Sequence, residues 1–99
     1  MALTATNAAR IYGLYPRKGS IAIGADADLV LWDIEREWVV SHEVLHDNCD
    51  YTPYEGMALK GFPVRTISRG ETVWQDGQIK GEAGRGRYLA CDLPEPPRP

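Results

Sequence analysis

The sequence predicts a mainly β fold: a small antiparallel or mixed, sandwich-like β domain with one short N-terminal helix and a disordered proline-rich tail. Three observations predict it: an apolar run at Asp28–Asp33, a series of short strand-like segments separated by turn residues after Pro63, and the prolines of the last eight positions. A chain of 99 residues has room for about one small domain. We therefore expect residues 1–91 to form the β domain and residues 92–99 a flexible tail.

The helix is predicted over Asn7–Tyr12. Thr4 or Thr6 can cap its N-terminus, and Gly13 suits the left-handed residue that ends a helix. A helix this short is unstable alone, because the cost of nucleation is recovered only over longer helices or by packing. The segment is therefore interpreted as the end of a longer helix that lies against another surface.

Two strands are expected in the first half of the chain. Gly19 and Gly24 interrupt the chain before Asp28–Asp33, which is apolar on both alternating faces and predicts a strand covered on two sides. Trp38–Val40 predicts a second short strand.

Residues 41–57 show neither a helical nor a strand period. Loops of this length are usually functional, interfacial or disordered. Tyr51, Pro53 and Tyr54 argue against disorder, so we expect this loop to lie on another surface.

An antiparallel meander is predicted from Val64 onward. The expected strands are Val64–Arg69, Thr72–Gln75 and Gln78–Lys80, with the first turn at Gly70–Glu71. The second turn, Asp76–Gly77, is a strong hairpin signal, because both central residues of a type I′ turn need positive φ.

Composition excludes several classes of function. The net charge is -3 and the basic residues are scattered, which argues against nucleic-acid and anionic-membrane partners. No apolar run approaches the roughly 20 residues of a membrane span. Cys49 and Cys91 form no C-x-x-C motif and the N-terminus shows no signal pattern, so we expect a reducing cytoplasm; a disulfide between them would need an oxidising compartment.

One pair of histidines has the spacing of metal ligands. His42 and His46 stand four residues apart, close to Asp47, Cys49 and Asp50. This region has no helical apolar stripe and no H-E-x-x-H motif, and loop histidines are commonly surface residues. We therefore predict no metal ligand here.

Other residues of chemical interest are interpreted structurally. Gly84 and Gly86 lack the preceding strand and following helix of a phosphate-binding loop. Three serines lack the G-x-S-x-G context of a nucleophile: Ser20, Ser41 and Ser68. Three aspartates border or lie near the apolar strand, where Asp more often bonds local backbone than transfers protons: Asp26, Asp28 and Asp33.

The chain resembles a known family in two places. Thr6–Leu14 followed by Pro16–Val30 resembles the C-terminal signature of the amidohydrolases. More specific are Asp50–Met57, Lys60–Pro63 and Arg69–Gly70, which are similar to the hydantoinase and dihydropyrimidinase branch. The resemblance covers roughly residues 4–89. Ala8, where relatives often carry proline, and the proline-rich tail depart from the pattern.

The resemblance implies that the catalytic residues of the parent enzyme lie in a barrel domain outside this chain. In that family a (β/α)₈ barrel holds two metal ions, usually zinc. Their ligands are a H-x-H pair, a carboxylated lysine, two further histidines and an aspartate. A metal-bound hydroxide attacks the cyclic amide. None of those motifs occurs here, so no catalytic, cofactor-binding or metal-ligating residue is assigned to this chain. What matches is the end of the last barrel helix, about residues 4–13, and the C-terminal strands of a small sandwich beside the barrel.

Within the long loop, four residues fit the family's pattern and are assigned packing or subunit contacts: His46, Asn48, Asp50 and Tyr51. Leu29–Trp32 and Tyr51–Tyr54 should present apolar surface that a barrel would otherwise cover, so the isolated chain should self-associate. The expected partner is a catalytic barrel or further copies of the chain in a homo-oligomer.

The resemblance therefore predicts the non-catalytic C-terminal segment of a metal-dependent hydrolase of cyclic amides, inactive alone. One alternative is a stand-alone interaction module related to the non-enzymatic dihydropyrimidinase-like scaffold proteins. Another is a small metal-binding protein that uses His42 and His46. The ring that the parent would open stays undetermined, and allantoinases and dihydroorotases remain possible parents.

Overall fold

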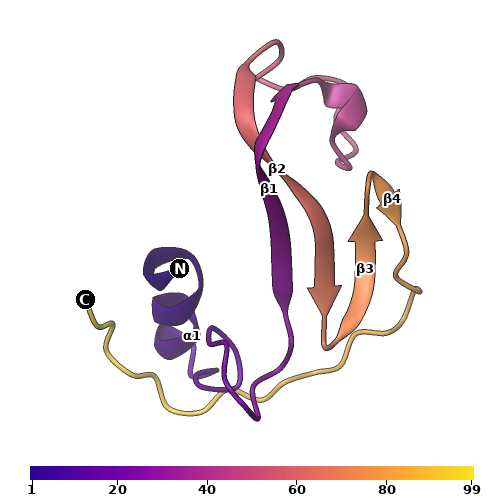
Figure 1. Cartoon of the computed structure of the whole chain (residues 1–99). Helices are drawn as coiled ribbons and strands as arrows, with labels where there is room; N and C mark the ends of the chain where they lie inside the picture. Colours follow the sequence, from indigo (N-terminus) through magenta and orange to yellow (C-terminus); the bar gives the residue numbers. More distant parts are fainter.

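The computed structural model describes residues 1–99, which form one open four-stranded sheet beside a short helical segment (Figure 1). The strand order is β1-β2-β3-β4 and every neighbouring pair is antiparallel. The prediction of a mainly β fold with a short N-terminal helix is confirmed, and the strands make a single layer. In chain order the elements are η1 (Ala2–Thr6), α1 (Asn7–Ile11), β1 (Leu29–Val39), η2 (His42–Val44), β2 (Ala58–Ser68), β3 (Glu71–Gln75) and β4 (Gln78–Ile79).

The N-terminal helix begins earlier than predicted. A π-helical turn, η1, leads directly into α1, so Thr6 is helical at φ -65° and makes no side-chain cap. The expected threonine cap is wrong because Thr6 lies inside the helical segment, and its hydroxyl donates instead to the Gly19 carbonyl at 2.8 Å. The predicted end is confirmed: Gly13 has φ +64°, which favours glycine.

One strand, β1, replaces the two that were expected. It pairs with β2 on both sides of an irregularity between Asp33 and Glu37. Asp33 Oδ1 accepts hydrogen bonds from the backbone N–H groups of Glu35 and Arg36, at 3.0 and 3.2 Å, which fixes the backbone of this bulge. The polar residues between the two predicted strands therefore form a bulge rather than a loop.

Strand β2 begins at Ala58, six residues before the predicted start, because Ala58 and Leu59 pair with the end of β1. The turn after β2 is also one residue earlier than predicted. Its central residues are Arg69 and Gly70, with φ +49° and +81°. The predicted turn at Asp76–Gly77 is confirmed, with φ +49° and +81°.

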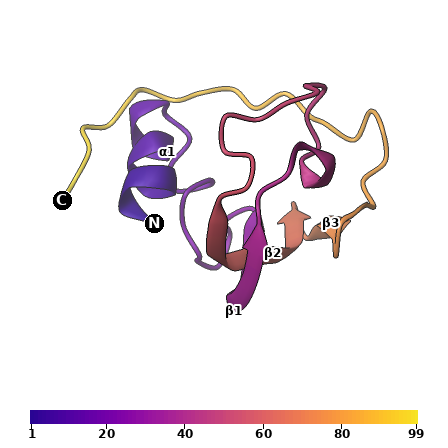
Figure 2. The ribbon, with the colours of Figure 1, turned by 90° about the horizontal axis from the view of Figure 1, so that it is seen from above.

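The loop between β1 and β2 closes on itself at its base. Val40 N–H donates to the Met57 carbonyl at 2.9 Å, and Gly56 N–H donates to the Val40 carbonyl at 2.8 Å. Within it, the Ser41 hydroxyl accepts from Glu43 N–H at the start of η2. Figure 2 shows this loop and the C-terminal segment on the same side of the sheet.

The chain has almost no core of its own. Only Ala9, Gly13 and Val40 are buried. Trp32 is 59% exposed and Val30 48% exposed in the strand that was expected to be covered on both sides. That expectation is wrong for this chain, because no second layer packs against β1.

The C-terminal segment runs back along α1 in an extended conformation (Figure 1). Asp92 N–H donates to the Gly13 carbonyl at 2.8 Å and Glu95 N–H to the Arg10 carbonyl at 2.9 Å. Arg98 exchanges two hydrogen bonds with the Asn7 side chain, at 3.0 and 3.1 Å. The flexibility expected of residues 92–99 stays a prediction. No helix in the structure is both long and apolar enough to span a membrane.

Candidate functional site

Three aromatic side chains gather on one face of the sheet. Trp38 of β1 and Phe62 of β2 make an edge contact with ring centres 5.0 Å apart, and Phe62 lies 6.1 Å from Trp74 of β3. The Arg36 guanidinium stacks over Phe62 at 4.2 Å. We call Trp38, Phe62 and Trp74 the aromatic cluster. With Trp32 it borders an open cavity of about 470 Å³, and so could receive apolar side chains of another surface.

A second apolar cavity of about 560 Å³ separates the helical segment from the sheet. Ala8 and Tyr12 line it on the helical side, and Leu29, Val30 and Trp32 on the β1 side. Trp32 borders both cavities, and its β1 neighbours Val30 and Leu31 are also exposed.

The two candidate metal ligands are each engaged with a protein group. His46 Nε2 accepts a hydrogen bond from Trp74 Nε1 at 2.8 Å. His42 Nδ1 lies 3.4 Å from Glu55 Oε2, and the same oxygen accepts from His42 N–H at 2.8 Å. The hydrogen bond from the His42 backbone lowers the pKa of Glu55, and bonds from the side chains of Ser41 and His42 lower it further.

The donor set does not fit the family's zinc centre. No three His, Cys, Asp or Glu side chains come together in an arrangement that could hold a metal ion. Cys49 and Cys91 are free and exposed, so neither is paired in a disulfide. No step of hydrolysis is therefore assigned to residues of this chain, and the predicted absence of metal ligands stays a prediction.

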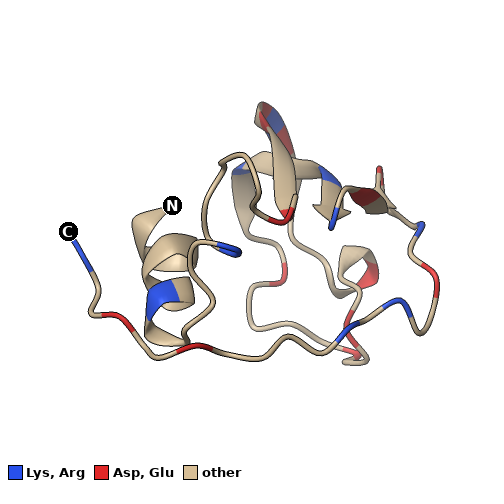
Figure 3. Cartoon of the chain, turned by 90° about the horizontal axis from the view of Figure 1, so that it is seen from below, with Lys and Arg blue, Asp and Glu red and all other residues tan.

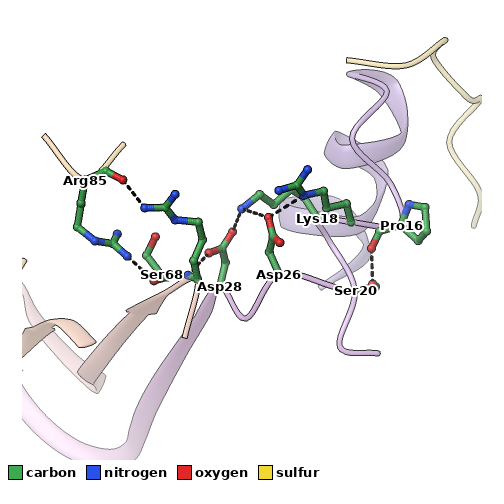
Figure 4. A network of polar contacts seen from close by, with 9 residues as sticks. Pro16, Lys18, Ser20, Asp26, Asp28, Ser68 and Arg85 are labelled. Atoms are coloured by element: carbon green, nitrogen blue, oxygen red, sulfur yellow. Dashed lines mark hydrogen bonds and ion pairs between the residues drawn. The ribbon is translucent and has the colours of Figure 1, made fainter. Parts of the chain in front are cut away.

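A network of polar contacts joins the loop before β1 to the turn between β2 and β3 (Figure 4). Lys18 Nζ lies 2.9 Å from Asp26 Oδ2 and also pairs with Asp28, while Arg17 Nε donates to Asp26 at 3.1 Å. Asp28 Oδ1 accepts from Arg69 N–H at 2.8 Å. Asp26 and Asp28 are thus used in ion pairs and in a backbone contact 41 residues away, whereas the predicted bonds to local backbone are made by Asp33.

The electrostatics of the network follow from these contacts. The hydrogen bond to Asp28 raises the pKa of Lys18. The hydrogen bond from Lys18 lowers the pKa of Asp26. Burial pushes the pKa of Asp28 upward, but the hydrogen bonds from Lys18 and from Arg69 N–H outweigh it and hold that pKa below its usual value.

The three candidate serines have structural contacts. Ser20 Oγ donates to the Pro16 carbonyl at 2.8 Å, Ser41 caps η2, and the Ser68 carbonyl accepts from Arg85 at 2.7 Å. The glycines at 84 and 86 lie in an irregular segment without a following helix. The absence of a nucleophile among these serines and of a phosphate-binding loop stays a prediction.

The aromatic cluster was missed by sequence reasoning. Trp38, Phe62 and Trp74 come from three strands, and only their register brings the rings together. Aromatic residues in three separate strand-like segments were the available signal. Charged residues of both signs are interspersed along the chain (Figure 3).

Comparison with known proteins decides the family. The profile of the Amidohydrolase family matches residues 1–73, which is most of the chain. The chain belongs to the amidohydrolase family. A D-phenylhydantoinase of Escherichia coli (strain K12 / DH10B) is 49% identical over 87 residues, covering 88% of this chain and 19% of the relative.

Solved structures of amidohydrolases agree with the fold. A D-hydantoinase from Bacillus sp. AR9 superposes with a TM-score of 0.89 at 43% identity, covering 94% of this chain and 20% of that one. A dihydropyrimidinase from Brevibacillus agri NCHU1002 gives 0.89 at 42% identity, covering 97% and 20%. This amidohydrolase chain therefore spans about a fifth of the length of its relatives and is hydantoinase-like, as the sequence motifs predicted.

Proposed function

We propose that this chain is the non-catalytic C-terminal β segment of a hydrolase of cyclic amide C–N bonds, of the hydantoinase or dihydropyrimidinase type. Its role is to supply packing or oligomer contacts. The observation that carries the proposal is the missing core: a sheet with large apolar side chains and only three buried residues needs a second surface.

The size of the uncovered surface supports a packing role. A large aromatic side chain buries about 150–250 Å². At about 25 cal/mol per Å², covering Trp32, which is 59% exposed, is worth roughly 2–4 kcal/mol. Val30 and Tyr12, at 48% and 68% exposure, border the apolar cavity of about 560 Å³ together with Trp32. Covering them adds to this free energy of burial.

The apolar character of the surface beside β1 suits it to packing rather than to a chemical reaction. The aromatic cluster and the walls of both cavities beside β1 are mostly apolar, and His46 at their margin is held by Trp74. A catalytic barrel would cover this face in the parent enzyme, and a second copy of the chain would cover it in a homo-oligomer.

Two measurements test the proposal on the purified chain. The first is hydrolysis of hydantoin and dihydrouracil with added zinc, beside metal analysis of the same sample. We expect no turnover and no stoichiometric metal, and turnover with bound metal would overturn the non-catalytic role.

The second measurement is sedimentation velocity across a range of protein concentrations. We expect the chain to associate as its concentration rises. A monomer that unfolds cooperatively would overturn the packing role and support the stand-alone interaction module instead.

A further inference from the structure

A third, polar cavity adjoins the apolar cavity between the helical segment and the sheet, with which it shares Lys18 and Asp26. It has a volume of about 250 Å³ and is formed where three segments meet. The loop after α1 contributes Arg17 and Lys18, the turn after β2 contributes Arg69, and the C-terminal segment contributes Arg85 and Arg87. These residues are up to 70 positions apart in the chain, so the fold itself assembles the cavity.

The cavity has an excess of positive charge. Arg17 and Lys18 pair with Asp26, Lys18 also pairs with Asp28, and Arg85 Nη2 lies 3.1 Å from Glu71 Oε2. Five basic side chains therefore meet three carboxylates, which leaves two positive charges uncompensated in a chain whose net charge is negative.

The uncompensated charges belong to Arg69 and Arg87. Neither guanidinium forms an ion pair with a carboxylate, although both line the cavity. A guanidinium presents five N–H donors, and an oxyanion is the ligand that can satisfy several of them at once.

Two of the basic side chains, those of Arg69 and Arg85, are held in place by hydrogen bonds to backbone carbonyls. Arg69 Nη2 donates to the Arg85 carbonyl, and Arg85 Nη2 donates to the Ser68 carbonyl at 2.7 Å. The N–H of Arg69 is anchored by Asp28 at 2.8 Å, which fixes the turn (Figure 4). Because the chain has already ordered the Arg69 side chain, an anion that binds to it avoids much of the usual ordering cost at that side chain.

We propose that this cavity binds a small oxyanion of the phosphate or carboxylate class, with Arg69 and Arg87 as the principal donors. The cavity is smaller than the roughly 300–1,000 Å³ of sites for drug-sized ligands, so its ligand is of the size of inorganic phosphate or a short carboxylic acid rather than a nucleotide. The two principal donors, Arg69 and Arg87, line neither apolar cavity, so the site is independent of the proposed packing role.

Titration calorimetry of the full chain with inorganic phosphate, and separately with succinate, tests the proposal at low ionic strength. We expect saturable binding of at least one of the two anions, with the preferred anion identifying the class. Arg87→Gln should weaken that binding at least fivefold, and Arg69→Gln should weaken it to a similar degree. Arg87 makes no ion pair or side-chain hydrogen bond, so Arg87→Gln tests the proposal even if Arg69→Gln proves unstable.

The matched control is Arg98→Gln, which removes one positive charge from the C-terminal segment outside the cavity. It should leave anion binding unchanged, with far-UV circular dichroism of all variants like that of the parent chain. Absence of saturable binding to either anion would overturn the proposal. An equal loss of binding in Arg98→Gln would also overturn it, because the effect would then follow from the net charge of the chain.

Discussion

The indole Nε1 of Trp74 donates a hydrogen bond of 2.8 Å to Nε2 of His46, joining β3 to the loop that follows β1. Because indole is only a donor, Nε2 of His46 is the acceptor in this bond. One of the two ring nitrogens through which histidine binds metals is thereby occupied. The same bond fixes the loop against the aromatic cluster.

Trp74→Phe should loosen this loop. Phenylalanine keeps a six-membered aromatic ring but removes the pyrrole ring with its N–H donor, and a net hydrogen bond is worth about 0.5–1.5 kcal/mol. We expect the free energy of urea unfolding to fall by about 1 kcal/mol or less, with faster proteolysis within residues 42–57. Trp32→Phe is the control, since Trp32 makes no side-chain hydrogen bond, and equal proteolysis in both variants would refute the anchoring role.

Asp28→Asn should lower stability in a pH-dependent way. The substitution removes the ion pair with Lys18 while leaving an oxygen that can accept from Arg69 N–H. The pKa of Asp28 lies below its usual 3.8 in the folded chain, so its stabilising contribution is present above that value and is lost as pH falls through the folded-state pKa. The side chain is 37% exposed, so screening limits the effect to about 1 kcal/mol or less.

The measurement is the difference in unfolding free energy between wild type and Asp28→Asn at pH 7 and at about pH 3. We expect a positive difference at pH 7 that shrinks at the lower pH. Asp47→Asn is the control, because Asp47 makes no ion pair or side-chain hydrogen bond. A difference that is independent of pH would show that the ion pair is not its source.

Gly13→Ala should detach the C-terminal segment from α1. Gly13 has φ +64°, where an L-residue costs about 1–2 kcal/mol. An added Cβ would also lie 1.9 Å from the Asp92 carbonyl oxygen, so the segment must move. We expect faster amide exchange at Asp92, whose N–H donates to the Gly13 carbonyl.

Gly84→Ala is the matched control for this effect. Gly84 has φ +80° but nothing within 4 Å of an added Cβ. Gly84→Ala therefore has the conformational cost of a positive φ without a steric clash. Faster exchange at Asp92 in both variants would attribute the effect to backbone strain alone.

Local chemistry predicted the parts of the fold that depend on few residues. Gly13 ended the helix and Asp76–Gly77 formed the hairpin turn, because each outcome rests on the preference for positive φ. The turn after β2 was misplaced by one residue, since Arg69 is not a usual residue for positive φ. Its conformation is held by the hydrogen bond to Asp28, 41 residues earlier, which no local pattern contains.

The candidate site was predictable only where the family resemblance supplied it. The loop Tyr51–Tyr54 was recognised by motif, whereas the aromatic cluster depends on the strand register. The extension of β2 back to Ala58 likewise follows from pairing with β1 rather than from its own alternation. The cavity between Arg69 and Arg87 joins segments with no shared local signal.

Trp32→Ser should weaken self-association of the chain. Trp32 borders both apolar cavities beside β1 and is 59% exposed, so a partner that covers the sheet would bury it. Losing roughly 2–4 kcal/mol of the free energy of burial corresponds to at least a tenfold rise in the dissociation constant of self-association. About 1.4 kcal/mol changes that constant tenfold. Tyr88→Ser is the control: Tyr88 is 95% exposed but lies off the sheet. Sedimentation velocity should show weaker association for Trp32→Ser alone; an equal effect of both variants would mean that association follows general hydrophobicity rather than the face beside β1.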